Sequence, residues 1–292
     1  MKTLETIVED IYGVITAKGG WNETVNEYFL THIGETMMSR LASPDQPRGT
    51  LRMSSIGQPC ARRLWYSVNT DPTTGEPLRS ATHLLFLYGD ILEDLILALA
   101  VAAGHSVEGR QDELEVLGVK GHRDAVIDGV TVDVKSASPF SFKKFKDGLT
   151  DADDGFGYLG QLPGYVHAAK DDPLVTDKNT GAFLVINKVN GELCLDVHDF
   201  KKDGRLDEIE DLYASRIESS GKPTPPARGF SPQPDGKSGN MKLGFNCSYC
   251  EYKKTCWPGL RTFLYKGPNG AAPRFLTTVM NEPKVMEVTD DD

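Results

Sequence analysis

Two aspartates and a lysine in the middle of the chain form the pattern best suited to chemistry. Residues 121–135 contain two β-branched runs that flank Asp128-Gly129, a dipeptide typical of a two-residue hairpin turn. Such a turn places Asp124 directly opposite Asp133 on the neighbouring strand. Side chains alternate along a strand, so Lys135 is expected on the same face as Asp133.

Opposed carboxylates indicate a divalent cation. Directly opposed side chains have Cβ atoms roughly 5 Å apart, where like charges destabilise a hairpin. A hairpin that binds Mg²⁺ requires such a pair, because hard cations are bound through carboxylate oxygens. Lys135 beside the cation would offset charge that develops on an attacked phosphate. The alternative is a surface hairpin with two solvated carboxylates and a lysine that neutralises them.

A third carboxylate occurs in a long apolar segment. Residues 82–104 are predicted to form a buried helix that is apolar on almost every side. A carboxylate there needs a partner or a metal ion, so Glu93 is a candidate ligand. Gly89, one turn earlier, would allow another group to approach closely. The alternative is a solvated stripe that Glu93 shares with Asp90 and Asp94.

The second sharp signal is a cysteine cluster. Cys247, Cys250 and Cys256 have the spacing C-x2-C-x5-C, which is one ligand short of a closed site. Cys60, in a loop before a short helix, is the natural fourth ligand, whereas Cys194 is predicted inside a strand. Four thiolates fit a 4Fe–4S cluster or a structural Zn²⁺. A lone cysteine with a distant triplet is atypical of zinc ribbons, which favours iron–sulfur.

Composition limits the class of protein. The chain has 292 residues, 39% of them hydrophobic and 25% charged, and a net charge of −10. This charge argues against a general nucleic-acid coat protein, but a local basic funnel can oppose it in a nuclease. The acidic residues 1–10 do not resemble a signal peptide, and the longest apolar run, 95–103, is too short to span a bilayer. A cytoplasmic protein without a membrane partner is expected.

The remaining elements must position these side chains. Strands and helices alternate, which predicts an α/β core with a mixed sheet. Lys143 and Lys144 are interleaved with phenylalanines after the hairpin, a pattern that suits a nucleic-acid strand, although a solvated helix face gives the same pattern. Helices are expected over 4–42 with a break at 18–20, and over 158–170 and 206–219, and a short helix or loop over 140–147. Strands are expected over 105–109, 112–117, 182–187 and 192–197, and loops over 43–49 and 221–239.

Together these pieces resemble the PD-(D/E)xK nuclease superfamily, in its RecB/AddB-like exonuclease branch with an iron–sulfur cluster. The resemblance covers about 70% of the chain, from Ser54 to Pro258. Asp133 stands where many relatives have glutamate, and the family accepts either residue. Residues 55–66 are also similar to phage-encoded members. The matching motifs are Gly89-x3-Glu93, Gly121-His-Arg-Asp124, Asp133-Val-Lys135, Gln161-x3-Tyr165, and Cys60 with Cys247, Cys250 and Cys256.

The resemblance implies a restriction-endonuclease-like α/β core with a central mixed sheet flanked by helices. Residues 1–50 would be an N-terminal helical segment. Residues 51–262 would form the nuclease core, with cluster ligands at both ends. Residues 263–292 would be a C-terminal extension with an acidic tail.

It also implies a Mg²⁺- or Mn²⁺-dependent deoxyribonuclease, most simply an exonuclease acting on DNA ends in recombination, repair or phage DNA processing. Lys135 would stabilise the transition state or orient the attacking water. No helicase motif precedes the nuclease, so a helicase, recombinase or single-strand-binding protein is a possible partner. The implied metal ligands are Glu93, Asp124, Asp133 and the Val134 carbonyl; the implied DNA contacts are Gln161, Tyr165, Arg62, Arg63, Lys143 and Lys144.

Two alternatives remain open on the sequence. The first is a catalytically silent DNA-binding or assembly module on a nuclease fold, against which the retention of Asp124, Asp133 and Lys135 argues. The second is a sequence- or structure-specific endonuclease, which the absence of an obvious recognition domain disfavours.

Overall fold

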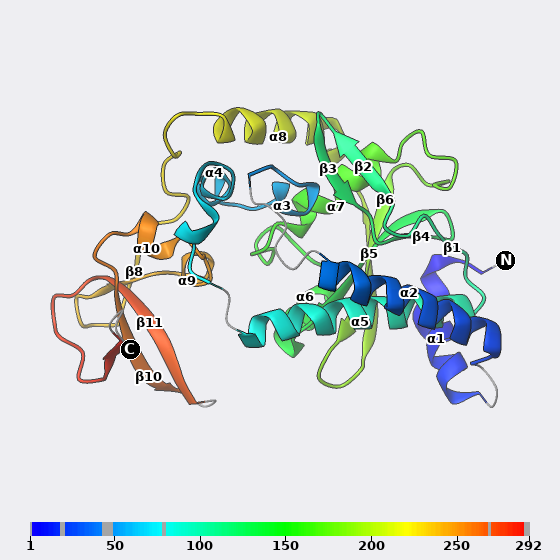
Figure 1. Cartoon of the computed structure of the whole chain (residues 1–292), viewed down its shortest axis with the longest axis horizontal. Coiled ribbons are helices and arrows are strands. Elements are labelled where there is room, and N and C mark those ends of the chain that lie inside the picture. Colours follow the sequence, from blue (N-terminus) through cyan, green and yellow to red (C-terminus); the bar gives the residue numbers. More distant parts are fainter. Residues whose placement is uncertain (1, 18–20, 43–48, 78–79, 268–269, 289–292) are drawn as a thin grey trace. The chain divides into compact units, whose positions relative to one another are not determined.

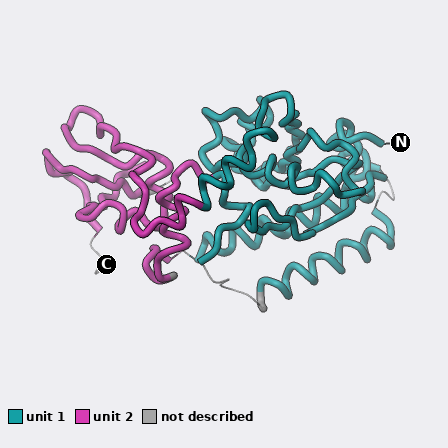
Figure 2. Tube along the Cα trace, turned by 90° about the horizontal axis from the view of Figure 1, so that it is seen from above, with its two compact units in different colours: residues 1–57, 79–217 teal, residues 58–78, 218–292 magenta. Residues whose placement is uncertain are grey.

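The computed structural model describes residues 2–17, 21–42, 49–77, 80–267 and 270–288. The predicted break at 18–20 and most of the predicted loop at 43–49 lie outside these ranges. The chain forms two compact units, one of residues 1–57 and 79–217 and the other of residues 58–78 and 218–292 (Figure 2). The boundaries of these units differ from those of the segments 1–50, 51–262 and 263–292, which the family motifs implied, because each unit contains residues from more than one segment.

The first unit is built on a five-stranded mixed sheet with the order β1-β4-β5-β6-β7. The pair β5–β6 is parallel and the other pairs are antiparallel, so the predicted mixed α/β architecture is confirmed. Parallel neighbours need a crossover connection, which the helices α6 and α7 provide. The elements are β1 (Val107–Glu108), β4 (Ala125–Ile127), β5 (Val130–Ala137), α6 (Pro139–Lys146), α7 (Tyr158–Ala168), β6 (Thr180–Asn187) and β7 (Leu193–Asp199).

The β4–β5 hairpin has the predicted register. Ala125 pairs with Val132, and Ile127 pairs with Val130 across the turn. Asp128 and Gly129 have φ values of 51° and 83°, as a two-residue turn of type I′ requires. The turn therefore fixes which residues of β5 face each layer of the unit.

Helices cover both faces of this sheet (Figure 1). On one face, η1 (Leu4–Thr6), α1 (Ile7–Thr16) and α5 (Ser80–Ala102) form a core with Val132, Val134 and the apolar side chains of β4 and β6. On the other face, α6 and α7 pack on Phe183, Val185 and Cys194. Alternation along β5 thus sends even-numbered residues toward α5 and odd-numbered residues toward α7.

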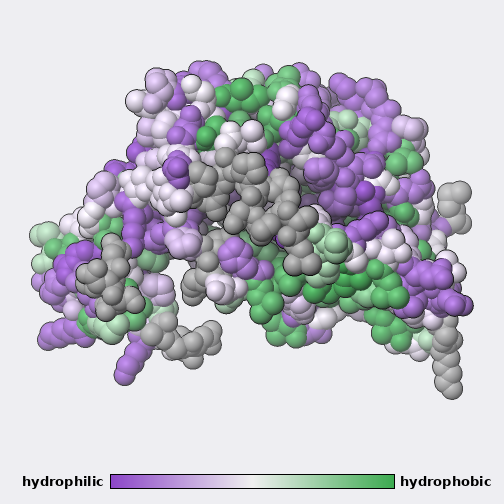
Figure 3. Space-filling model, viewed as in Figure 1, coloured by the Kyte–Doolittle hydropathy of each residue, from purple (hydrophilic) through white to green (hydrophobic). Residues whose placement is uncertain are grey.

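The helix α2 (Glu23–Ala42) packs on α5. Apolar residues gather on the surface over these helices (Figure 3), among them Leu30, Leu84 and Phe86, which are at least half exposed. A two-stranded ribbon of β2 (Glu113–Val116) and β3 (Val119–His122) leads into the hairpin, and α3 (Met53–Ile56) and α8 (Arg205–Ser220) flank α7.

The second unit contains an antiparallel sheet with the order β12-β10-β11-β9-β8, which the sequence analysis did not predict. Much of residues 263–288, expected to be an extension, belongs to its strands. Among the described residues, no helix combines the length and apolar character needed to cross a membrane. The elements are α4 (Ala61–Asn69), η2 (Pro72–Thr74), β8 (Gln233–Pro234), β9 (Met241–Lys242), α9 (Phe245–Ser248), α10 (Lys253–Cys256), β10 (Arg261–Gly267), β11 (Gly270–Thr278) and β12 (Glu287–Val288).

Candidate functional site

Asp133 and Lys135 form an ion pair on the α7-facing side of β5. Lys135 Nζ lies 2.5 Å from Asp133 Oδ2, and Asp133 is only 5% exposed. The ammonium group also lies 5.1 Å from the centre of the Tyr158 ring, a distance at which a ring attracts a cation. The two residues therefore share a face, as the alternation predicts, and are held among apolar groups.

Asp124 lies just before β4 and turns its carboxylate toward β5. Its Oδ2 accepts a hydrogen bond of 2.7 Å from the backbone N–H of Val134. Burial raises the pKa of Asp124 well above its ordinary value, and the neighbouring carboxylates of Glu93 and Asp133 raise it further. The charges of the other two predicted carboxylate ligands, Glu93 and Asp133, therefore act on Asp124.

Glu93 reaches the same neighbourhood from α5. Burial raises its pKa to about 7, with further increases from Asp94 and Asp133, while Arg110 opposes the shift. Gly89 makes this approach possible, because a Cβ there would lie 3.3 Å from Ser136 Oγ on β5. The predicted close approach at Gly89 is therefore present.

The carboxylates of Glu93, Asp124 and Asp133 repel one another electrostatically, which raises the pKa of Glu93 and of Asp124. Burial disfavours the charged form of Lys135, but Asp133 and Asp124 outweigh burial and raise its pKa above the ordinary value. Within the described ranges, no three His, Cys, Asp or Glu side chains converge closely enough to be recognised as a metal-binding group. The donor set nevertheless fits a hard divalent cation, since such a cation would relieve the repulsion among these carboxylates, of which Asp133 is buried and the other two are half-buried.

Gln161 and Tyr165 lie one turn apart on α7. Tyr165 is 3% exposed, and its pKa is raised by burial and then by Asp133 and Asp124. Gly121 provides the space for its phenol, because a Cβ at that position would lie 2.8 Å from Tyr165 Oη and 2.6 Å from Met53 Cβ. The predicted pair is therefore beside the carboxylates.

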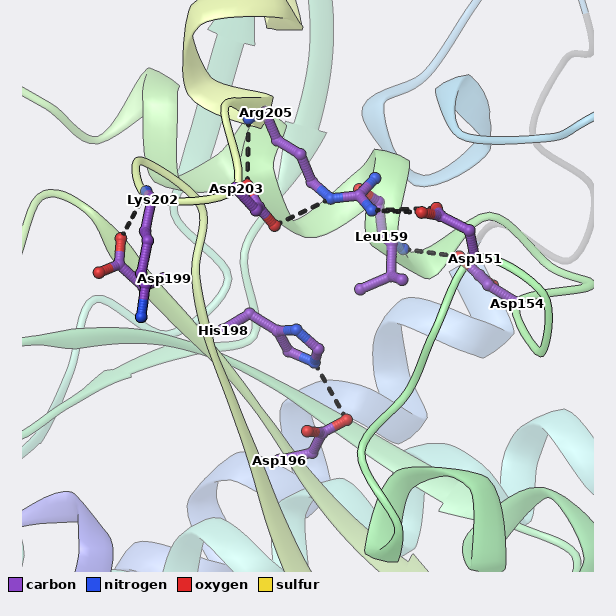
Figure 4. A network of polar contacts seen from close by, with 9 residues as sticks. All are labelled: Asp151, Asp154, Leu159, Asp196, His198, Asp199, Lys202, Asp203 and Arg205. Carbon is purple, nitrogen blue, oxygen red and sulfur yellow. Dashed lines mark hydrogen bonds and ion pairs between the residues drawn. The ribbon is translucent and has the colours of Figure 1, made fainter.

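A polar network fixes the beginning of α7 (Figure 4). Asp154 accepts the backbone N–H groups of Gly157 and Leu159, each at 2.7 Å. Arg205 donates to the Leu159 carbonyl and pairs with Asp151. On the sheet, His198 lies 3.0 Å from Asp196, whose carboxylate also accepts the N–H of Leu149. These contacts hold the segment that brings Tyr158 over Lys135.

The predicted basic DNA contacts are engaged within their own units. Arg62 donates to the Pro226 carbonyl and to Tyr66, and Arg63 pairs with Glu251. Exposed Lys143 pairs with Asp147, and Lys144 donates to the Asp153 carbonyl while lying over the Phe140 ring. Their role in DNA binding stays a prediction.

Beside Glu93 is a polar cavity of about 510 Å³. The sequence analysis did not predict Gln111 or Arg110, which lie in the wall of this cavity. Arg110 could have been found from Asp94, because a buried carboxylate needs a cationic partner. Arg40 on α2 contributes a bidentate ion pair to Asp90. The cavity is lined by His32, Glu35, Thr36, Ser39, Arg40, Asp90, Glu93, Arg110, Gln111 and His122.

The four predicted cluster cysteines all belong to the second unit and are free thiols. Cys60 precedes α4, and the other three lie in or beside α9 and α10. Burial raises the pKa of Cys247, and the thiols of Cys60 and Cys256 raise it further. Burial also raises the pKa of Cys250 to about 12, with smaller contributions from Glu251 and Cys60. The four thiols therefore lie in one unit, where Cys60 influences the pKa of Cys247 and of Cys250, whereas Cys194 is buried in the core beneath α6 and α7.

Comparisons with known proteins add little. No family model and no curated protein matches this chain. A solved structure described as "Crystal structure of SSO0001" is similar with a TM-score of 0.39 and 16% sequence identity, over 80% of this chain and 96% of the other. At this level of similarity it identifies no family.

Proposed function

We propose that this protein is a metal-dependent DNA nuclease that hydrolyses phosphodiester bonds, and that it is an exonuclease acting on DNA ends. The observation that carries the proposal is the ion pair of buried Asp133 with half-buried Lys135, whose charges interact with those of Asp124 and Glu93. Carboxylates that repel one another are unfavourable in a purely structural role, and carboxylates of this kind are what a cation-assisted phosphoryl reaction requires.

Glu93, Asp124, Asp133 and the Val134 carbonyl would hold Mg²⁺ or Mn²⁺ in this proposal. The bound metal would polarise the scissile phosphate and lower the pKa of a bound water. The raised pKa of Lys135 keeps a proton on its Nζ. Lys135 would therefore stabilise negative charge on the phosphate rather than act as a base.

Gln161 and Tyr165 would position the DNA backbone, because they lie on α7 beside Asp133 and Asp124. Arg62, Arg63, Lys143 and Lys144 are the candidates for further phosphate contacts, which would require some of them to exchange their present partners for DNA. The enzyme would act in the cytoplasm, with a helicase, recombinase or single-strand-binding protein as a possible partner.

Cys60, Cys247, Cys250 and Cys256 would hold a 4Fe–4S cluster, with structural Zn²⁺ as the alternative. The four thiols belong to one unit, and Cys60 affects the pKa of Cys247 and Cys250, which supports a shared cofactor. Because cofactor binding would join α4 to α9 and α10, it would contribute directly to the stability of that unit.

The test uses labelled linear, circular and single-stranded DNA with Mg²⁺. The wild type should degrade the substrates that have ends, whereas Lys135→Ala and Asp124→Ala should bind DNA and leave it intact. Lys201→Ala, an exposed lysine paired with Asp207, is the matched control and should cleave normally. Cleavage by Lys135→Ala at the wild-type rate would refute the assignment, and cleavage of closed circles would indicate an endonuclease.

A further inference from the structure

The turn at residues 109–112 adopts an unusual backbone conformation. Gln111 has a φ of 54° and Gly109 a φ of 58°. Positive φ is uncommon for a residue with a side chain and carries strain. The Gln111 side chain extends from this turn and donates from Nε2 to Glu93 Oε1 at 3.0 Å. The strained residue is thus the one that contacts a proposed metal ligand.

A buried arginine holds the turn in this conformation. Arg123, 2% exposed, donates from Nε to the Gly109 carbonyl at 3.0 Å and pairs with Asp112 at 2.5 Å and Asp172 at 2.6 Å. A Cβ at Gly109 would lie 2.2 Å from Arg123 Nη2, so the guanidinium group needs glycine there. A buried charge with three partners resists displacement.

The neighbouring residue anchors the turn to α5. Arg110 forms an ion pair with Asp94, which is 1% exposed. Consecutive residues of the turn, Arg110 and Gln111, therefore contact consecutive residues of α5, Asp94 and Glu93. Through this double contact, the turn holds the Glu93 carboxylate from outside its own helix.

We propose that Gln111 is a positioning residue that orients the Glu93 carboxylate for a divalent cation. The inference rests on the proposed function, because it assigns Glu93 to the cation. A neutral amide suits this role, since it occupies Oε1 without supplying a positive charge that would compete with the cation. Hydrogen bonds from outside the ligand set commonly strengthen metal affinity by about 10–100-fold.

The test measures Mn²⁺ binding by isothermal titration calorimetry and thermal unfolding in EDTA. Gln111→Gly removes the donor and relieves the positive φ, so the unfolding midpoint should stay or rise while the Mn²⁺ dissociation constant increases about 10-fold or more. Gln111→Met, similar in size but without a donor, should weaken Mn²⁺ binding likewise. Leu117→Gly is the matched control, because Leu117 also has a positive φ, 49°, and is 52% exposed; its Mn²⁺ affinity should not change.

Unchanged Mn²⁺ affinity in Gln111→Gly would overturn the proposal. So would a parallel loss of stability and affinity in that variant, which would make the residue structural, or a wild type that binds no Mn²⁺. A third outcome separates the two proposals. If both Gln111 variants bind Mn²⁺ more weakly than the wild type but the wild type cuts no DNA, the positioning role is supported and the nuclease function is rejected.

Discussion

Lys135 and Asp133 are paired two residues apart on one face of β5, with Nζ 2.5 Å from Oδ2. Such a pair is ordinary at a surface, where it contributes little. Here Asp133 is buried, and its charge interacts with those of Asp124 and Glu93. Variants of this pair should therefore change both protein stability and DNA cleavage, and the two effects can be measured separately.

Lys135→Met should destabilise the metal-free protein, because it leaves the Asp133 carboxylate buried without its cationic partner. We expect a loss of about 3 kcal/mol in the free energy of unfolding, measured by urea unfolding in EDTA. The double variant Lys135→Met/Asp133→Asn should recover most of this stability and still fail to cleave DNA. Recovery of cleavage in the double variant would show that the pair is not catalytic.

Glu93 should make stability depend on pH. Its pKa is about 7 in the folded protein and about 4.5 when unfolded, so between these values the folded state binds more protons. Stability therefore falls as pH rises through this window, by on the order of 3 kcal/mol in total. Glu93→Gln should remove the penalty and raise the unfolding midpoint in EDTA at pH 8 by roughly 5 °C.

The pH comparison supplies its own control. At about pH 3.5 or below, the Glu93 carboxyl is largely protonated in both states, so wild type and Glu93→Gln should have nearly equal stability. Mg²⁺ at pH 8 should then stabilise the wild type more than the variant. A variant that is less stable than the wild type at pH 8 would contradict the pKa assigned to Glu93.

The sequence predicted the parts of the site that depend on local rules. Asp128-Gly129 determines the hairpin register, and alternation along β5 places Asp133 with Lys135. Gln111 was not predictable, because its role depends on a positive φ and on Arg123, whose partners Asp112 and Asp172 are distant from it in sequence. Local rules do not identify such partners.

The second sheet was missed for a related reason. Its strands β8, β9 and β12 have two residues each, too few to show alternation. The longer strands β10 and β11 contain glycine and proline, which mark turns more often than strands. Their pairing comes from tertiary contacts that the sequence pattern does not express.

Cysteine variants should separate cofactor ligands from core thiols. Cys247→Ser should lose the brown colour and bound iron of anaerobically prepared protein, and should unfold at lower temperature because the cofactor contributes to folding. Cys194→Ser is the matched control, since Cys194 is 8% exposed in the core on the α6 and α7 face. It should keep its iron at a modest cost in stability. Stoichiometric zinc in a colourless wild type would instead indicate a structural zinc site.

Gly121→Ala tests whether β3 must approach Met53 and Tyr165 closely. The added methyl group would lie 2.6 Å from Met53 Cβ and 2.8 Å from Tyr165 Oη, and overpacking of this kind costs about 1–3 kcal/mol. Gly13→Ala in α1 is the control: a Cβ there meets no atom within 4 Å, so better helix propensity should stabilise it by about 0.5–1 kcal/mol. If Tyr165 positions DNA, Gly121→Ala should also slow cleavage, because the phenol must move away from Asp133 and Asp124. Equal stability of the two variants in urea would show that the Gly121 contact is not restrictive.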